Sequence, residues 1–473
     1  MGTDDTPGCR PAGSETTPAA GHPHRLVILL VVSAALFMSS IDQTIVATAL
    51  PALHRDLHTT INWSGWTITV YSLGRLTIVP LAGRLGDRLG RRRVFLLGTA
   101  VFTVASLVCG AANDIYVLVV LRAVQALGGG ALMPSATGIV AEHFGRDRDR
   151  AVGAFTSIIP VGGIVGPVLG GLFVTYWSWR GIFLVNVPLG AALIAVGLKV
   201  IPAGRPARPA DRIDLPGAVL LTLSVLAAMY AVTYLGEGGT SPLGPAFLGL
   251  IASAVLGLVL LVRRSTRHPD TAIIPARLLR GRGFGVMNVI NFLYGGAALG
   301  FGALVPLYAQ QRYGIRSLEA GTLLTARAVG MIVVATLTVL ALRRTGYRLP
   351  MVAGFALSAA GLAGMTVPPV GGISPYAWLA VASALMGIGM GTTSPASNNA
   401  SLQLEPESAM AVAGLRVMFR QAGSIIAVSV TTAILARSYH PGIAQSHVFL
   451  VFAIILVAAI PLVFRVPEHK GSW

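Results

Sequence analysis

A single carboxylate, Asp42, lies within a long apolar segment that begins at Leu26. A charge inside a membrane core costs roughly 2.5 to 3.5 kcal/mol on insertion scales, and such residues usually face a cavity, have a partner or carry protons. Burial there allows an acid to bind and release a proton under physiological conditions. The alternative is that Asp42 lies near the outer surface, is hydrated and has only a structural role. We favour the first interpretation and predict that Asp42 is a proton-coupling residue.

Arg122 is the predicted partner of Asp42. Asp42 lies eight residues before Leu50, the outer end of the first apolar segment, and Arg122 lies seven residues after Ile115, the outer start of the fourth. Helical residues advance about 1.5 Å each, so the two side chains have about the same depth. The sequence leaves open whether they touch. Gln125 shares a helix face with Arg122 and is predicted to line a polar cavity.

Other cations also lie within apolar segments. Arg75 and Arg327 are predicted to line a cavity or to pair with groups on other helices. Arg416 and Arg420 lie near the cytoplasmic end of a segment, where we expect their long side chains to extend to the membrane surface. The segments contain neither a nucleophile with a base nor spaced His and acid ligands. The sequence therefore predicts no catalytic residue, no enzyme activity and no metal site.

The composition is that of a membrane protein. Of the 473 residues, 54% are hydrophobic and 11% are charged, and apolar stretches of about 20 residues alternate with short polar loops. The predicted fold class is therefore an all-α polytopic membrane protein. We predict fourteen transmembrane helices, which start at about Leu26, Trp63, Val94, Ile115, Ala151, Gly181, Leu215, Pro245, Phe284, Gly321, Pro350, Ala377, Ala409 and Val448.

The net charge of +17 follows the predicted loops. Arginines are concentrated after every second span, as in the stretch from Arg84 to Arg93, and are scattered in the intervening loops. Because basic loops remain in the cytoplasm, this pattern places those loops and both termini on the cytoplasmic side. The pattern explains the charge without a nucleic-acid partner.

Two parts of the chain repeat at a fixed offset. The stretch "GGGALMPSATG" from Gly128 resembles "GIGMGTTSPASN" from Gly387, and Pro134 pairs with Pro395 at an offset of 261 residues. Parallel repeats indicate two halves with a substrate site between them. Six spans need fewer residues than this offset, so two additional helices are predicted between the halves. The predicted divisions are a disordered cytoplasmic tail at 1–25, a six-helix half at 26–201, linkers with two extra helices at 202–283, a second six-helix half at 284–465 and a cytoplasmic tail at 466–473.

The loop "GRLGDRLGRRRV" is predicted to act as a conformational latch. Its glycines permit tight turns, and its one acid, Asp87, lies among arginines and could bind a neighbouring helix or loop. The alternative is that the cations only fix the topology. The corresponding loop of the second half, "LRRTGYRLP", has no acid, so the sequence predicts a degenerate latch in that half. The latch residues are Gly83, Asp87, Arg88, Gly90 and Arg91.

A stripe of glycines marks the predicted fifth span. Gly162, Gly166 and Gly170 recur every four residues, with Pro167 beside them. Small residues on one face allow two helices to pack backbone to backbone, and the proline adds a kink. Close packing alone and a role in gating explain the stripe about equally well.

Six segments in order resemble the signature motifs of the major facilitator superfamily. They are "IDQTIVATALP", "GRLGDRLGRRR", "RAVQALGGGALMP", "GGIVGPVLGG", "WRGIFLVNVPLG" and "RVMFRQAGSIIAV". The branch that they resemble is the fourteen-span drug:proton antiporter family of the EmrB/QacA type. The resemblance implies alternating access, with Asp42 as the coupling acid, Arg122 as its modulator and Asp87 in the latch, and the Gly166-Pro167 pair is typical of antiporters.

The resemblance implies a pump that exports drugs, antibiotics or lipophilic metabolites in exchange for protons. The alternative is a proton-coupled uptake symporter of the same fold. The expected energy source is the proton gradient, with no cofactor, and the expected partners are a lipophilic small molecule, protons and the lipid bilayer. We expect a monomer in the bacterial inner membrane. Because the spans contain several arginines and almost no acid besides Asp42, a neutral or anionic substrate is as plausible as a cationic one.

Overall fold

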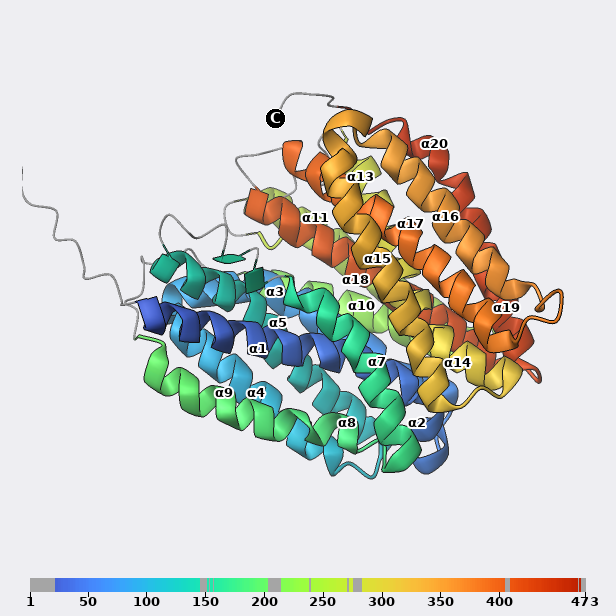
Figure 1. The fold of residues 1–473 in the computed structure, drawn as a ribbon, viewed down its shortest axis with the longest axis horizontal. Coiled ribbons are helices and arrows are strands. Elements are labelled where there is room, and N and C mark those ends of the chain that lie inside the picture. Colours follow the sequence, from blue (N-terminus) through green and yellow to red (C-terminus); the bar gives the residue numbers. More distant parts are fainter. Residues whose placement is uncertain are drawn as a thin grey trace, which may run out of the picture.

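The computed structural model describes residues 22–144, 151–152, 154–155, 157–202, 214–237, 240–269, 272–274, 283–404, 409–466 and 468. The first group of helices comprises α1 (His22–Ile45), the short η1 (Val46–Thr48), α2 (Leu50–Asp56), α3 (Ile61–Leu89), α4 (Arg91–Gly110), α5 (Ile115–Phe144), α7 (Ile158–Tyr176), α8 (Gly181–Leu184) and α9 (Asn186–Val200). We refer to this group as the N-terminal half. In Figure 1 it appears in blue to green.

The second group, the C-terminal half, appears in yellow to red in Figure 1. It comprises α13 (Phe284–Gly295), the π-helical turn η3 (Gly296–Phe301), α14 (Gly302–Tyr313), α15 (Ser317–Thr345), α16 (Arg348–Thr366), α17 (Pro375–Gln403), α18 (Ala409–Arg437), α19 (Pro441–Ala458) and α20 (Ile460–Val463). Two helices lie between the halves in sequence, α10 (Leu215–Gly236) and α11 (Pro245–Arg267). The prediction of an all-α fold is confirmed.

Thirteen helices of the described residues are long and apolar enough to cross a membrane. α3 is not among them, although it has 29 residues and packs within the N-terminal half, because its sequence is more polar. Most predicted starts agree with the structure to within a few residues. The count of fourteen spans remains a prediction.

Three predicted boundaries differ from the structure. α1 begins at His22, within the predicted tail, and the remainder of that tail lies outside the described residues. The fifth predicted start, Ala151, lies in helical residues before α7, which begins at Ile158. The last predicted span corresponds to α19, which begins at Pro441 and not at Val448. It contains the polar Gln445, which is buried because its amide donates to the Leu304 carbonyl oxygen at 2.9 Å, and hydropathy alone missed that pairing.

The internal repeat is visible as one helix contact made twice. In the N-terminal half, a Cβ atom added to Gly128 of α5 would lie 2.6 Å from the Gly98 carbonyl oxygen of α4. In the C-terminal half, a Cβ atom added to Gly389 of α17 would lie 2.5 Å from the Gly354 carbonyl oxygen of α16. Both distances are shorter than any real Cβ contact, so only glycine permits these helices to cross so closely. Gly128 and Gly389 are separated by the same offset of 261 residues as the sequence repeat.

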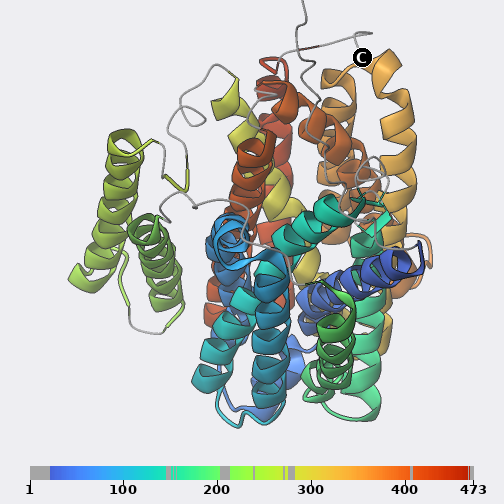
Figure 2. The same ribbon diagram turned by 90° about the vertical axis from the view of Figure 1, so that its left-hand side faces the viewer.

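α10 and α11 form a hairpin beside the two halves. Figure 2 shows the pair standing at the side of the bundle. α10 packs against α11 and also against α3 and α18, one helix from each half. At the opposite end from the arginine-rich loops, Asn62 of α3 donates to the Thr233 carbonyl oxygen at 3.1 Å, and Trp66 donates to the Thr233 hydroxyl at 2.8 Å. α11 instead carries a row of exposed leucines and valines, as expected for a surface that faces lipid.

The other end of the hairpin is held by Asp214. Its carboxylate is buried, caps α10 by accepting from the Gly217 amide at 3.0 Å, and accepts from Arg264 Nε of α11 at 2.6 Å. The Ile273 amide donates to the same carboxylate at 3.3 Å. Burial by itself raises the pKa of the Asp214 carboxyl, but Arg264 and the two amides outweigh burial and hold the pKa below its ordinary value.

Replacing Asp214 with Asn is expected to lower the thermal stability of the purified protein by an amount equivalent to about 1 kcal/mol. Asn still caps the helix, but it carries no charge for Arg264, which is partly exposed and therefore partly screened. The pKa of Asp214 is lower in the folded chain than in the unfolded one. Its contribution to folding stability is therefore present above the unfolded pKa and is lost as the pH falls through the folded pKa. The difference in Tm between wild type and D214N should therefore be the same at about pH 7 and about pH 5. Equal Tm values for the two proteins at both pH values would contradict this role of Asp214.

Candidate functional site

Asp42 is completely buried and is surrounded by hydrogen-bond donors. Its Oδ2 accepts from Arg122 Nη1 at 2.7 Å. Its Oδ1 accepts from Gln125 Nε2 at 2.8 Å and from Asn186 Nδ2 at 3.1 Å. These donors come from α5 and α9, so a carboxylate on α1 joins three helices of the N-terminal half. The predicted pairing of Asp42 with Arg122, which the sequence left open, is a direct ion pair in the structure.

Arg122 is fixed in place by further contacts. Its Nε donates to the Thr67 carbonyl oxygen at 3.1 Å, and its Nη1 donates to Gln125 Oε1 at 2.7 Å. Its guanidinium carbon lies 4.1 Å from the centre of the Tyr71 ring and 5.6 Å from that of Phe183. A charged pair removed from water is tolerated only when hydrogen bonds and good geometry compensate for the lost hydration. Both side chains satisfy this requirement here.

Three members of this cluster were not predicted from the sequence. Asn186 is a polar amide in the middle of the apolar stretch "WRGIFLVNVPLG". A single polar residue in such a stretch is a signal that could have identified it. Ser106 of α4 accepts from Gln125 Nε2 at 2.7 Å, and Tyr71 of α3 stacks on Arg122. Serine and tyrosine are common in spans, so no feature of the sequence singles out these two residues.

A cavity of about 210 Å³ lies between the halves. It is lined by residues of α1, η1, α3, α5 and α7 on one side and of α13, η3, α14, α15, α17 and α18 on the other. We call it the central cavity. Arg122 and Tyr71 line it, whereas Asp42 does not, so the ion pair lies directly behind the wall of the N-terminal half. Only the Arg122 end of the pair faces the cavity.

Of the three residues predicted to line a cavity, the structure places one, Arg327 of α15, in the wall of the central cavity. Gln125 does not line it, because it is buried against Asp42 and Ser106. Arg75 does not line it either, but its Nη1 donates at 2.5 Å to Gln43, which does. Arg420 was expected at the membrane surface and instead lines the cavity, because its guanidinium stacks 4.4 Å from the centre of the Tyr294 ring.

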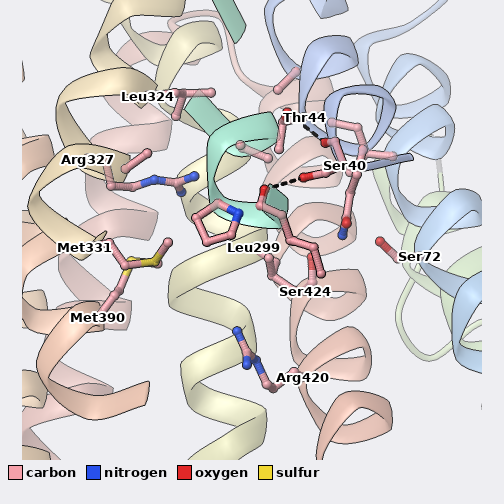
Figure 3. A pocket seen from close by; sticks show the side chains of 18 of the residues that line it. Ser40, Thr44, Ser72, Leu299, Leu324, Arg327, Met331, Met390, Arg420 and Ser424 are labelled. Atoms are coloured by element: carbon pink, nitrogen blue, oxygen red, sulfur yellow. Dashed lines mark hydrogen bonds between the residues drawn. The ribbon is translucent and has the colours of Figure 1, made fainter. Parts of the chain in front are cut away.

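Figure 3 shows the two cations of the C-terminal half in the cavity, with Arg327 and Arg420 reaching into the same space from α15 and α18. Met331 and Met390 lie beside Arg327. Ser40 and Thr44 of α1 lie across from them. The wall of the C-terminal half is thus cationic and apolar, and the wall of the N-terminal half carries hydroxyl groups and Arg122.

The predicted latch joins helices of the N-terminal half. Gly90 has a φ of +93°, a conformation that favours glycine, and this turn brings the start of α4 back against the end of α3. Arg91 donates to the Gly138 carbonyl oxygen of α5 at 2.8 Å, and it lies 3.4 Å from both Asp87 and Glu142. Asp87 is half exposed. In this state the contacts of the motif centre on Arg91.

The other members of the latch loop have simpler places. A Cβ atom added to Gly83 would meet nothing, and Arg88 is exposed. Arg84 donates to the Ala272 carbonyl oxygen at 3.1 Å, which ties the loop to the segment that holds Asp214.

The corresponding loop of the C-terminal half finds an acid elsewhere in the chain. Arg348 Nε lies 3.5 Å from Glu468, and it donates to the Val466 carbonyl oxygen at 2.8 Å. Val466 is buried. The described part of the predicted C-terminal tail is therefore packed on the protein, and it supplies a carboxylate that the local sequence lacks.

The glycine stripe of α7 packs on α1. A Cβ atom added to Gly162, Gly166 or Gly170 would lie within about 2.1 to 2.6 Å of Ser40, Thr44 or Thr48, respectively. The stripe therefore sets how closely α7 approaches the helix that carries Asp42. Pro167 lies on another face, where its carbonyl oxygen would meet a Cβ atom of Gly321 in α15 at 2.4 Å. The same motif thus serves close packing within one half and contact with the other.

The two halves touch at the end opposite the arginine-rich loops. A Cβ atom added to Gly171 of α7 would lie 2.7 Å from Leu318 Cα of α15. On the other side of the bundle, the Thr432 hydroxyl of α18 donates to Asn62 Oδ1 of α3 at 3.3 Å. Figure 1 shows α2, α7 and α14 close together at this end. We call it the closed end.

Metal chemistry has no support in the part of the chain that the structure describes. Within those residues no group of three or more His, Cys, Asp or Glu side chains could hold a metal ion. The cavity supplies charge, hydroxyl groups and apolar surface, which bind a molecule and do not by themselves react with it.

Known proteins with a similar sequence are membrane transporters. The multidrug transporter protein MdtP of Bacillus subtilis is 30% identical over 379 residues, which is 78% of this chain and 68% of that protein. The tetracenomycin C resistance and export protein of Streptomyces glaucescens is 31% identical over 415 residues, which is 85% of this chain and 77% of that protein.

Solved structures show the same fold at lower sequence identity. The crystal structure of the peptide transporter POT in complex with sulfate superposes with a TM-score of 0.68 and 17% identity, and the match covers 93% of this chain and 96% of that one. The family model described as Major Facilitator Superfamily matches residues 32–278 and 286–473. The chain therefore belongs to the Major Facilitator Superfamily, whose members are transporters and not enzymes.

Proposed function

We propose that the protein exports lipophilic drugs, antibiotics or metabolites in exchange for protons, by alternating access. The observation that carries the proposal is the buried Asp42–Arg122 pair, which lies directly behind the wall of the central cavity. The names of the two relatives, a multidrug transporter and an antibiotic export protein, support the class of substrate.

The pair is suited to couple a proton to a substrate. Asp42 accepts three hydrogen bonds, which it does best as a carboxylate. When Asp42 takes up a proton, Arg122 loses its counter-charge and Gln125 and Asn186 lose an anionic acceptor. Because Arg122 lines the cavity, its field inside the cavity then increases. Proton binding behind the wall therefore changes what the cavity can bind in front of it.

Alternating access requires that the closed end can open. Its closest approaches between α7 and α15, and between α3 and α18, are made at glycines, hydroxyls and one amide. If the arginine-rich loops are cytoplasmic, as their charge favours, the closed end is the outer end and this is the inward-facing state. The α7 stripe then lets α1 and α7 move as one body, and the latch around Arg91 keeps α3, α4 and α5 together.

The fourteen-span drug:proton antiporter branch is part of this proposal. It is supported by α10 and α11 between the two halves, and by the length of α3, which has 29 residues although it is too polar to be one of the 13 apolar spans. We place the protein in the bacterial inner membrane as a monomer, with both termini in the cytoplasm. The proton gradient supplies the energy, and no cofactor takes part.

Direction of proton flow separates export from uptake. In an antiporter, substrate added outside the proteoliposomes moves inward while protons move outward, so an enclosed pH-sensitive dye is expected to report a rise in internal pH. A symporter, the alternative, moves both in the same direction. Protein-free liposomes give the leak of each species. Protons and substrate moving in the same direction would show symport and contradict the proposed antiport. Substrate movement with no proton movement would show that transport is not coupled to protons.

A further inference from the structure

The described residues that line the central cavity include more cations than anions. Three arginines line it, Arg122, Arg327 and Arg420, whereas no Asp or Glu is found among its described lining residues. The negative charge of Asp42 balances the positive charge of Arg122, because the two form a buried ion pair at 2.7 Å. The remaining two cations belong to the C-terminal half, and both reach into the same space (Figure 3).

Arg420 is the cation whose surroundings are clearest. Its guanidinium stacks on Tyr294, and its Nε has no hydrogen-bond partner among the described residues. Arg416 lies one turn away on the same helix, and its Nε also lacks such a partner. Like charges four residues apart on a helix repel each other. An anion placed in the cavity beside the Arg420 guanidinium would supply a counter-charge.

The remainder of the wall is suited to an apolar molecule. Met331 and Met390 lie beside Arg327, and Leu299 and Leu324 line the same region. Methionine side chains adapt to irregular apolar shapes and make favourable contacts with aromatic rings. A ligand that fills this space would carry an apolar or aromatic body with one acidic group at its end.

We propose that the exported substrate is a lipophilic anion whose carboxylate or other acidic group binds between Arg327 and Arg420. The planar guanidinium group presents paired donors that match a carboxylate. The Ser424 hydroxyl lines the same cavity, whereas the hydroxyls of Ser40 and Thr44 already donate to backbone carbonyl oxygens. A lipophilic cation would have to approach these two arginines without any lining carboxylate to attract it. This inference specifies the substrate class for the proposed export function and rests on that function.

Two dyes of one scaffold with opposite charge provide the test. Fluorescein is an anionic xanthene, and a cationic rhodamine ester carries the same ring system. Uptake of each dye into inside-out vesicles with an acidic lumen would be measured for wild type. We expect transport of fluorescein and little transport of the rhodamine ester.

Variants then assign the effect to the two arginines. R327Q and R420Q should each raise the KM for fluorescein about tenfold or more, which is the typical effect of losing a hydrogen bond to a charged group. R420K keeps the charge but loses the paired donors and the stacking on Tyr294, so its KM should lie between those of wild type and R420Q. The matched control is R465Q, the same loss of charge at an exposed residue outside the cavity. Comparable Tm values for all variants would exclude misfolding, and R420E is expected to favour the cationic dye.

The outcomes separate this inference from the proposed function. Transport of the cationic dye in exchange for protons, with fluorescein excluded, would overturn the anion site and leave proton-coupled export standing. An unchanged KM for fluorescein in both R327Q and R420Q would also overturn the site. If neither dye, nor any member of a chemically diverse panel, moves against a proton flux, the export function fails and this inference fails with it.

Discussion

Replacing Asp42 with Asn is expected to abolish drug resistance conferred by the protein. Asn has nearly the same shape and still accepts hydrogen bonds from Gln125 and Asn186, but it carries neither a proton nor the charge that Arg122 pairs with. Susceptibility to a diverse panel of compounds would be measured in a host stripped of its own pumps, at matched expression. Cells with D42N should be as sensitive as cells without the protein.

Loss of folding must be separated from loss of coupling. Removing one partner of a buried ion pair typically costs about 3 to 5 kcal/mol, so D42N is expected to melt at a lower temperature than wild type. Exchange of labelled substrate across proteoliposomes without a pH gradient should nevertheless persist, because that exchange needs a folded cavity and no proton. The control is D114N, the same change at the exposed carboxylate that caps α5 through the Tyr116 amide.

Equal protection by D42N and wild type would show that Asp42 is structural. The coupling acid would then have to lie elsewhere. Glu319, which is bonded to Arg316 at the closed end of α15, would be the next carboxylate to replace.

A disulfide across the closed end is expected to stop transport completely. A Cβ atom added to Gly65 of α3 would lie 3.3 Å from Thr432 Cβ of α18, close to the roughly 3.5 to 4.5 Å between the Cβ atoms of a disulfide. Oxidation of the double variant G65C/T432C should therefore join the two halves while that end is closed. If the protein works by alternating access, the closed end must open once per cycle, so transport should stop on oxidation and return on reduction.

The native cysteines need to be controlled in this experiment. Cys109 is buried in α4, and Cys9 lies outside the described residues, so both would be replaced by serine or alanine first. Each single variant, G65C and T432C, should be insensitive to oxidation. Gly65 already touches Thr432, so the reduced double variant must be shown to transport before it is oxidised. Full transport by the cross-linked protein would contradict the opening of this end.

The sequence was sufficient for features that depend on local composition. Apolar stretches of membrane length, interrupted by arginine-rich loops, indicated an all-helical membrane fold and most of the helix starts. The glycine repeats indicated that Gly128 and Gly389 hold equivalent places in two halves, and the structure shows the same backbone crossing at both. One acid and one arginine at equal depth were enough to propose the pair of Asp42 and Arg122.

The structure alone decided which side chains face one another across helices. Gln125 and Arg122 share a helix face, but a small rotation of that face puts Gln125 behind the cavity wall and Arg122 in it. Asn186 reaches Asp42 from a helix 144 residues away in the chain, and Glu468 reaches Arg348 across 120 residues. Hydropathy and helical periodicity act over a few turns of one helix, so they determine where a helix runs and how deep a residue lies. Contacts such as these, and the positive charge that Arg420 brings into the cavity, depend on how helices far apart in sequence pack together.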